Sequence, residues 1–169
     1  MEKKEEKQSL PEESIVSDST APPAKVEPGK NESTGSRVLI AYFSMPEDAD
    51  TSGVDAISGA SIVVRDGERE GNTEFVAKII QETVGGDLFR IETVQDYPLD
   101  HDPLVDQAAD EQEENLRPEL ASHIENLEQY DTIILGYPNW WGDLPMPVYS
   151  FLEEYDFGAK TIIPFVTHG

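Results

Sequence analysis

Residues 131–145 read Asp-Thr-Ile-Ile-Leu-Gly-Tyr-Pro-Asn-Trp-Trp-Gly-Asp-Leu-Pro, the most informative stretch of the sequence. Thr132–Leu135 is an apolar, largely β-branched run followed by Gly and Pro, a pattern typical of a strand buried on both faces. In an open parallel sheet, the loops after the carboxyl ends of the strands form the ligand crevice. Trp140 and Trp141 fall in such a loop, where two indole rings are costly to leave in water. The stretch predicts a flat cofactor beside them; a core plug or a partner-binding patch is the alternative.

Apolar runs alternate with helical patterns along the rest of the chain. The predicted strands are Val38–Phe43, Leu88–Val94, Thr132–Leu135 and Thr161–Val166, and the predicted helices are Asn72–Thr83, Glu119–Leu127 and Val148–Tyr155. Strand–helix alternation of this kind favours a parallel sheet with helices on both faces. We therefore expect an α/β domain, a doubly wound, three-layer α/β/α parallel sheet.

Two polar segments interrupt the alternation. Met45–Glu70 separates the first strand from the first helix, where a loop of about 2–6 residues is usual. Within it, Ser61–Gly67 has the pattern of an extended piece that ends in a turn. Asp96–Arg117 is strongly acidic. We expect both segments to be surface excursions.

The composition excludes several classes of function. The chain has 35 Asp and Glu against 12 Lys and Arg in 169 residues, a formal net charge of −23, which disfavours nucleic acids and anionic membranes as partners. No apolar run is long enough to be a transmembrane segment. The chain has no cysteine, so disulfides, thiolate catalysis and Cys-ligated metals are excluded. We predict no metal site and no catalytic side chain, and we expect His101 and His123 to be surface residues.

A change of composition at about Ser36 predicts two parts. Residues 1–36 are rich in Glu, Lys, Ser and Pro and contain no aromatic residue. Such a segment cannot bury enough apolar surface to offset its ordering entropy, so we expect a disordered acidic tail. Residues 37–169 form the predicted globular domain.

The turn between the first strand and the first helix is a candidate phosphate site. Ser44 ends the strand, and Gly71-Asn72-Thr73 opens the helix. A helix N-terminus offers free N–H donors and partial positive charge to an anion. Capping of the helix by Asn72 or Thr73 is the alternative. A Gly-x-Gly-x-x-Gly fingerprint and a Walker Gly-Lys-Ser/Thr are absent, so dinucleotides and ATP are weak candidates.

Together these stretches resemble a bacterial flavodoxin-like family. The resemblance covers nearly everything after residue 36 and rests on Val38–Ser44, Gly71–Thr73, Tyr137–Pro145 and Ile163–Gly169. It implies non-covalent FMN binding at the switch point between the first and third strands of a sheet in the order 2-1-3-4-5.

The resemblance also assigns candidate cofactor-binding residues. Ser44, Asn72 and Thr73 would contact the phosphate. Pro138, Asn139, Trp140 and Trp141 would frame the isoalloxazine ring. Thr167, His168 and Gly169 would approach it from the next loop, although a loop-capping role for His168 is equally open. Compared with the family, the sequence stops within the third flavin loop, so we expect an incomplete domain that lacks the last strand and helix and has an apolar edge strand.

The resemblance implies an electron-transfer flavoprotein rather than a self-contained enzyme. Surrounding carboxylates oppose an anionic reduced flavin, so the acidic chain predicts a low-potential electron carrier with basic redox partner proteins. An FMN-dependent NAD(P)H or quinone oxidoreductase and a flavin-free interaction module are the alternatives. We expect a cytoplasmic protein, or one tethered at the cell surface through its tail.

Overall fold

The computed structural model describes residues 37–53, 56–57 and 59–168. The predicted N-terminal tail and Gly169 lie outside the described residues. Among the described residues, no helix combines the length and the apolar character needed to cross a bilayer.

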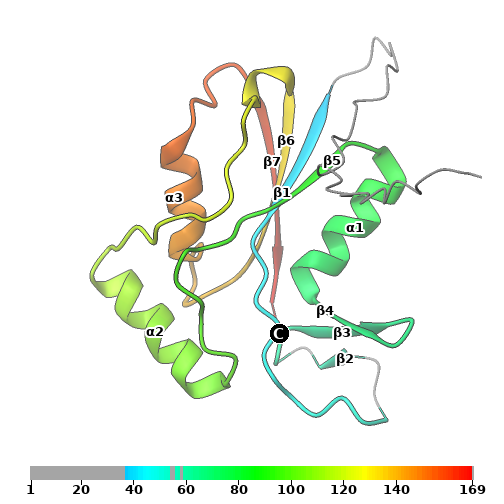
Figure 1. The fold of residues 1–169 in the computed structure, drawn as a ribbon, viewed down its shortest axis with the longest axis vertical. Coiled ribbons are helices and arrows are strands. Elements are labelled where there is room, and N and C mark those ends of the chain that lie inside the picture. Colours follow the sequence, from blue (N-terminus) through cyan, green and yellow to red (C-terminus); the bar gives the residue numbers. More distant parts are fainter. Residues whose placement is uncertain (1–36, 54–55, 58, 169) are drawn as a thin grey trace, which may run out of the picture. The chain divides into compact units, whose positions relative to one another are not determined.

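The main sheet has four parallel strands in the order β5-β1-β6-β7. They are β1 (Val38–Tyr42), β5 (Asp87–Arg90), β6 (Thr132–Pro138) and β7 (Thr161–Thr167). β1 pairs with β6 from Val38↔Thr132 to Tyr42↔Gly136, so the first and third predicted strands are neighbours, as expected. The predicted α/β fold with a parallel sheet is confirmed (Figure 1).

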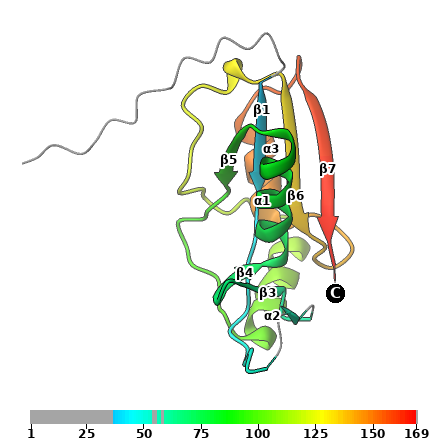
Figure 2. The ribbon, with the colours of Figure 1, turned by 90° about the vertical axis from the view of Figure 1, so that its right-hand side faces the viewer.

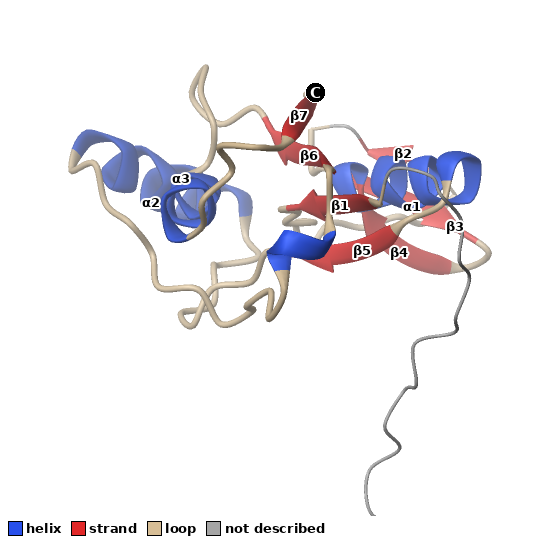
Figure 3. Cartoon of the chain, turned by 90° about the horizontal axis from the view of Figure 1, so that it is seen from above, coloured by secondary structure: helices blue, strands red, loops and turns tan. Residues whose placement is uncertain are grey.

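Helices cover both faces of this sheet. α1 (Asn72–Val84) lies on one face, and α2 (His101–Glu113) and α3 (Met146–Glu154) lie on the other (Figure 3). Successive side chains of β1 therefore enter different cores. Leu39 and Ala41 pack in a cluster with residues of α2 and α3, whereas Ile40 and Tyr42 pack with Ala77 of α1. A continuous apolar run is required because both faces are buried.

A small antiparallel sheet forms within the predicted excursion between β1 and α1. It contains β2 (Ala56–Ile57), β3 (Ile62–Arg65) and β4 (Glu68–Gly71) in the order β2-β3-β4. The extended piece and turn predicted at Ser61–Gly67 are confirmed: Asp66 and Gly67 join β3 to β4 with φ values of 53° and 85°. Two positive φ angles match the twist of a two-residue hairpin. The small sheet lies beyond the carboxyl ends of the main strands, next to the start of α1 (Figure 2).

The helix predicted at Glu119–Leu127 is wrong. The segment is irregular up to the 3₁₀ turn η1 (Leu127–Gln129), and Leu120 forms a bridge with Thr93 beyond β5. Leu120 and Leu127 are nevertheless buried, so their apolar spacing reflects contact with the core rather than a helix. The predicted strand Leu88–Val94 is also shorter and ends at Arg90.

The segment predicted to be an acidic excursion instead contains α2. Leu104, Ala108 and Glu111 are its buried residues. The spacing of these three residues places them on one face, and most of the acidic residues point to solvent. One of the three buried positions is itself a carboxylate, which obscures the amphipathic pattern in the sequence.

β7 lies at the edge of the main sheet and pairs with β6 over seven residues, from Thr132↔Thr161 to Pro138↔Thr167. Ile162, Ile163 and Val166 are exposed. The predicted apolar edge strand is thus present in the described part of the chain.

Candidate functional site

A cavity of about 210 Å³ opens at the carboxyl ends of β1, β6 and β7. It is the crevice in which an open parallel sheet places its ligands. Its walls come from the loops after these three strands, from the start of α1, from the inserted segment and from α2. The lining residues are Met45, Glu47, Gly59, Ser61, Asn72, His101, Leu104, Val105, Ala108, Pro138, Asn139, Trp140, Trp141, Thr167 and His168.

The tryptophan loop is a tight turn. The N–H of Trp140 donates to the carbonyl of Asp143 at 3.1 Å, and the N–H of Asp143 donates back to Trp140 at 3.0 Å. Trp141 and Gly142 occupy the two central positions with φ values of 52° and 80°. A left-handed conformation is unfavourable for a bulky residue such as Trp141 and often accompanies a functional constraint.

The two indole rings have different surroundings. Trp140 is half-buried and packs edge-on against Phe43 and Tyr97, with ring centroids 5.3 and 5.6 Å away. Trp141 is 59% exposed, and its Nε1 donates to the carbonyl of Val105 in α2 at 3.1 Å. One ring thus belongs to the core wall of the cavity, and the other lies at its mouth.

The start of α1 is hydrogen-bonded to the segment that follows β1 and to the last residue of β7. Ser44 is buried, and its Oγ accepts a hydrogen bond from the backbone N–H of Glu74 at 3.4 Å. The hydroxyls of Thr73 and Thr167 lie 2.7 Å apart. Gly71 is the N-cap residue, so the alternative that Asn72 or Thr73 caps the helix is wrong. A Cβ at Gly71 would lie 2.0 Å from Ser44 Oγ, which explains why glycine stands here.

The inserted segment reaches the same helix start. The backbone N–H of Asn72 donates to the carbonyl of Ser61 at 2.9 Å. Ser61 also has a positive φ of 54° and lines the cavity. Two amides at the helix start, those of Asn72 and Glu74, are therefore already bonded within the chain.

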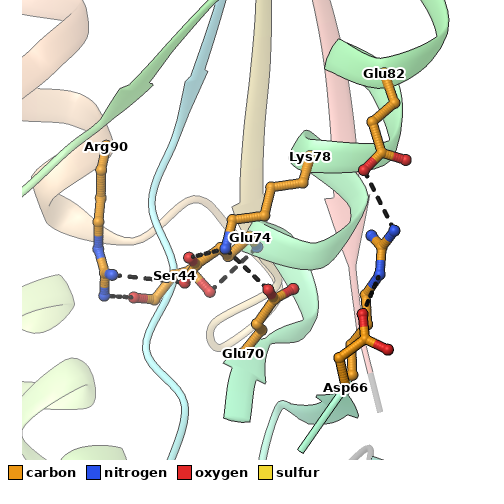
Figure 4. Close-up of polar contacts among 8 residues, drawn as sticks. Ser44, Asp66, Glu70, Glu74, Lys78, Glu82 and Arg90 are labelled. Atoms are coloured by element: carbon orange, nitrogen blue, oxygen red, sulfur yellow. Dashed lines mark hydrogen bonds and ion pairs between the residues drawn. The ribbon is translucent and has the colours of Figure 1, made fainter. Parts of the chain in front are cut away.

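Charged side chains next to the start of α1 neutralise one another (Figure 4). Lys78 Nζ lies 2.8 Å from Glu74 and 2.9 Å from Glu70. Its hydrogen bond to Glu74 and a second to Glu70 raise the pKa of the Lys78 ammonium well above its ordinary range. Arg90 lies 3.5 Å from Glu74, and its Nη2 donates to the carbonyl of Ser44.

The other two cations near this turn are also paired. Arg65 contacts Glu82 at 3.3 Å, and Arg69 contacts Asp48 at 2.9 Å. A phosphate at the start of α1 would have to be held mainly by backbone amides and neutral side chains. This agrees with the small number of basic residues near the turn in the sequence.

Another wall of the cavity comes from residues that are not among the predicted site residues. His101 Nδ1 at the start of α2 lies 2.9 Å from Glu47 of the inserted segment. This contact joins two segments that were both predicted to be excursions. Leu104, Val105 and Ala108 supply apolar surface from the next turns of α2. Helical spacing of Leu104 and Ala108, with Pro103 in the first turn, is the sequence signal that could have revealed this wall.

The cavity brings together seven of the ten predicted cofactor-binding residues. These are Asn72, Pro138, Asn139, Trp140, Trp141, Thr167 and His168. Ser44 and Thr73 are buried at the base of α1 and do not line the cavity, and Gly169 lies outside the described residues. Of the two histidines predicted on the surface, His101 lines the cavity although its side chain is 61% exposed, and His123 contacts Glu154 at 2.7 Å. Over the described ranges, no cluster of three or more His, Asp or Glu side chains could hold a metal ion.

Fold and cavity together define an open, parallel α/β protein with its crevice at the carboxyl edge of the sheet. The chain belongs to the flavodoxin family, whose sequence profile matches residues 61–169. Flavodoxin 1 of Escherichia coli (strain K12) is 28% identical over 107 residues, which are 59% of this chain and 44% of that protein. Flavodoxin 1 of Shigella flexneri matches with the same values. The chain spans less than half the length of these curated relatives.

Solved structures give the same assignment of fold. One is a protein from Bacteroides eggerthii DSM 20697 that is described as a candidate flavoprotein. Its sequence is 29% identical to this chain, and the two structures superpose with a TM-score of 0.61. The match covers 80% of this chain and 72% of the Bacteroides chain. A flavoprotein from Lactobacillus acidophilus NCFM, solved in complex with FMN, has a TM-score of 0.54 over 78% of this chain and 74% of its own. The latter is 20% identical and supports the fold alone.

Proposed function

We propose that this protein binds FMN in the cavity at the carboxyl ends of β1, β6 and β7 and acts as a low-potential electron carrier. The main support for the proposal is that Trp140, Trp141 and Asn72 line the same cavity of about 210 Å³. A planar ring would lie beside the indoles, and its phosphate would point toward the start of α1. Membership of the flavodoxin family and the FMN complex of a protein with the same fold add support.

The residues present fit such a cofactor. The cavity has an apolar wall from Leu104 and Ala108 and an aromatic wall from Trp140, and both suit a flat ring. The side chains of Asn139 and Thr167 offer neutral hydrogen bonds to the polar edge of such a ring. Asn72 is the predicted phosphate ligand that reaches the cavity; Ser44 and Thr73 would act by fixing the helix start. Bound flavin would supply the redox chemistry, and the protein would supply position and electrostatics.

The acidic surface supports the choice of a carrier with basic partners. α2 carries exposed acidic residues and also contacts the exposed Trp141 through the Val105 carbonyl. A partner that approaches the mouth of the cavity would therefore meet negative charge, which speeds encounter with a basic surface. We propose that redox partners dock on this side with Lys- and Arg-rich surfaces.

Equilibrium dialysis with FMN and with riboflavin tests the cofactor assignment. We expect uptake of one FMN per chain and weaker uptake of riboflavin, because riboflavin lacks the phosphate that the start of α1 would hold. Trp140→Ala should lose FMN, whereas the control His123→Ala should retain it because His123 does not line the cavity. Equal affinity for both ligands would contradict the phosphate assignment, and no uptake of either would contradict the proposal.

Turnover assays separate a carrier from an enzyme. The FMN-loaded protein is mixed with NADH or NADPH and a quinone, with and without an added flavodoxin reductase. A carrier becomes reduced at an appreciable rate only when the reductase is present. Rapid oxidation of the nicotinamide without reductase would favour the oxidoreductase instead.

A further inference from the structure

Glu111 is a buried carboxylate on α2 that the proposed cofactor site does not use directly. The residue is 7% exposed. Tyr97 donates its hydroxyl to Oε2 at 2.6 Å, and Gln107 donates its amide to Oε1 at 2.9 Å. Each oxygen thus accepts a hydrogen bond from a neutral donor, an arrangement that suits an ionised carboxylate because this form only accepts.

Within the described part of the chain, no basic group pairs with this carboxylate. Glu111 takes part in no ion pair among the residues that the structure describes. Its remaining surface borders a second cavity of about 230 Å³, whose lining includes Gln95, Pro118 and Glu119 and contains no Lys or Arg. A buried carboxylate without a cation is costly, and a neutral side chain could make the same hydrogen bonds. Packing alone does not account for a charge at this position.

The position of Glu111 connects it to the proposed cofactor site. Leu104 and Ala108 line the main cavity, and Glu111 follows them on the same face of α2. Tyr97, which holds Glu111, packs edge-on against Trp140 with a centroid distance of 5.6 Å. One buried aromatic ring therefore separates the Trp140 wall from a fixed negative charge.

We propose that Glu111 sets the reduction potential of flavin bound in the main cavity. The inference rests on the proposed FMN binding. An electron added to the flavin meets the field of the Glu111 carboxylate through a medium of low polarity, so the reduced state is disfavoured. Glu111 would act through space and would not touch the cofactor, and the hydrogen bonds from Tyr97 and Gln107 would hold its carboxylate in place.

Redox titration of the FMN-loaded protein tests this role. Glu111→Gln keeps an amide oxygen that can accept the Tyr97 hydrogen bond and removes the charge. We expect the affinity for reduced relative to oxidised flavin to increase about tenfold, which is about 59 mV in a one-electron midpoint potential. Glu113→Gln, an exposed acidic position on the same helix, is the matched control and should shift the potential far less.

Salt distinguishes the buried charge from the surface charges. In 1 M KCl the Debye length is about 3 Å, so any effect of Glu113→Gln should vanish while the effect of Glu111→Gln persists. Gln107→Lys offers a second variant if Glu111→Gln does not fold, because a lysine four residues before Glu111 would neutralise the same carboxylate. It should also raise the potential.

The outcomes separate the two proposals. Variants that fold, take up FMN and keep the potential of the unchanged protein would overturn the role of Glu111 and leave FMN binding intact. Failure of the unchanged protein to take up FMN would overturn the proposed function and this inference together.

Discussion

Trp140 and Trp141 are adjacent residues of one type in one turn, yet the structure holds them in opposite ways. Trp140 is half-buried against Phe43 and Tyr97. Trp141 is 59% exposed, has a positive φ of 52° and makes one hydrogen bond to α2. The first indole therefore contributes to core packing, whereas the second is held with a strained backbone. Contact with a ligand would explain that strain.

Trp140→Ala should have the largest effect on this pair. Removing a half-buried ring that packs against two others should destabilise the fold by about 2–3 kcal/mol. Trp141→Ala, its natural control, should stay within about 0.5 kcal/mol of the unchanged protein because the ring is mostly in solvent. Urea denaturation in the absence of FMN measures both values. Equal losses would show that the two rings contribute equally to the core.

Gly71→Ala tests the other end of the cavity, where the helix start is held rigidly. A Cβ at this position would lie 2.0 Å from Ser44 Oγ. We expect a loss of about 2 kcal/mol from overpacking, and weaker FMN uptake because the start of α1 moves. The double variant Ser44→Ala/Gly71→Ala removes the clashing hydroxyl and should recover most of the stability. A double variant no more stable than Gly71→Ala alone would exclude the close approach as the cause.

Alkaline pH should reduce the stabilising contribution of Tyr97, which packs against Trp140. Burial, together with the hydrogen bond to Glu111, raises the pKa of Tyr97 well above the ordinary value of 10.0. Since the folded pKa lies above the unfolded one, the contribution of Tyr97 is complete below pH 10 and declines as the pH rises further. Between pH 8 and pH 11 this decline should be about 1 kcal/mol.

Denaturation at these two pH values checks the effect. Tyr97→Phe should show a smaller decline than the unchanged protein, because Phe does not ionise. Tyr130→Phe provides a comparison at the other end of the sheet, where burial and Asp87 raise the pKa of Tyr130 to about 12. Identical pH dependence in the unchanged protein and in Tyr97→Phe would contradict the assignment.

The smallest expected effect is the cost of the backbone strain at residue 141. The difference in stability between Trp141→Gly and Trp141→Ala measures it. Both variants remove the indole, so only the cost of a positive φ differs between them. We expect the glycine variant to be more stable by about 0.5–1 kcal/mol, since glycine adopts this conformation without a Cβ clash. The denaturation midpoints of the two variants are enough to measure this difference in stability. A more stable alanine variant would mean that the turn relaxes once the ring is absent.

Much of the fold could be predicted because its strands are buried on both faces. Val38–Phe43 and Thr132–Leu135 are continuous apolar runs, and Arg65-Asp66-Gly67 carries the turn signal of a hairpin. α2 could not be recognised in the same way, since its buried face holds Leu104, Ala108 and the carboxylate of Glu111. Burial of Glu111 depends on Tyr97, whose position is a property of the folded chain.

Part of the site could also be predicted from the sequence, because the strands that position it could be predicted. Loop residues after β6 and β7 reach the cavity because strand ends determine where loops begin. Ser44 and Thr73 carry hydroxyls in suitable places, but Ser44 accepts a hydrogen bond from Glu74 and Thr73 pairs with Thr167. Thr167 lies 94 positions away from Thr73, so no local pattern reveals that the Thr73 hydroxyl is engaged.

The most direct test uses the two indole N–H groups as reporters. The chain contains two tryptophans, so a ¹⁵N-labelled sample gives two indole resonances, which Trp140→Phe and Trp141→Phe assign. Titration with FMN should shift both resonances and saturate at one FMN per chain, while the Trp141 indole loses or alters its hydrogen bond to Val105. FMN binding that leaves both indole resonances unchanged, or no binding at all, would contradict a flavin site at this loop.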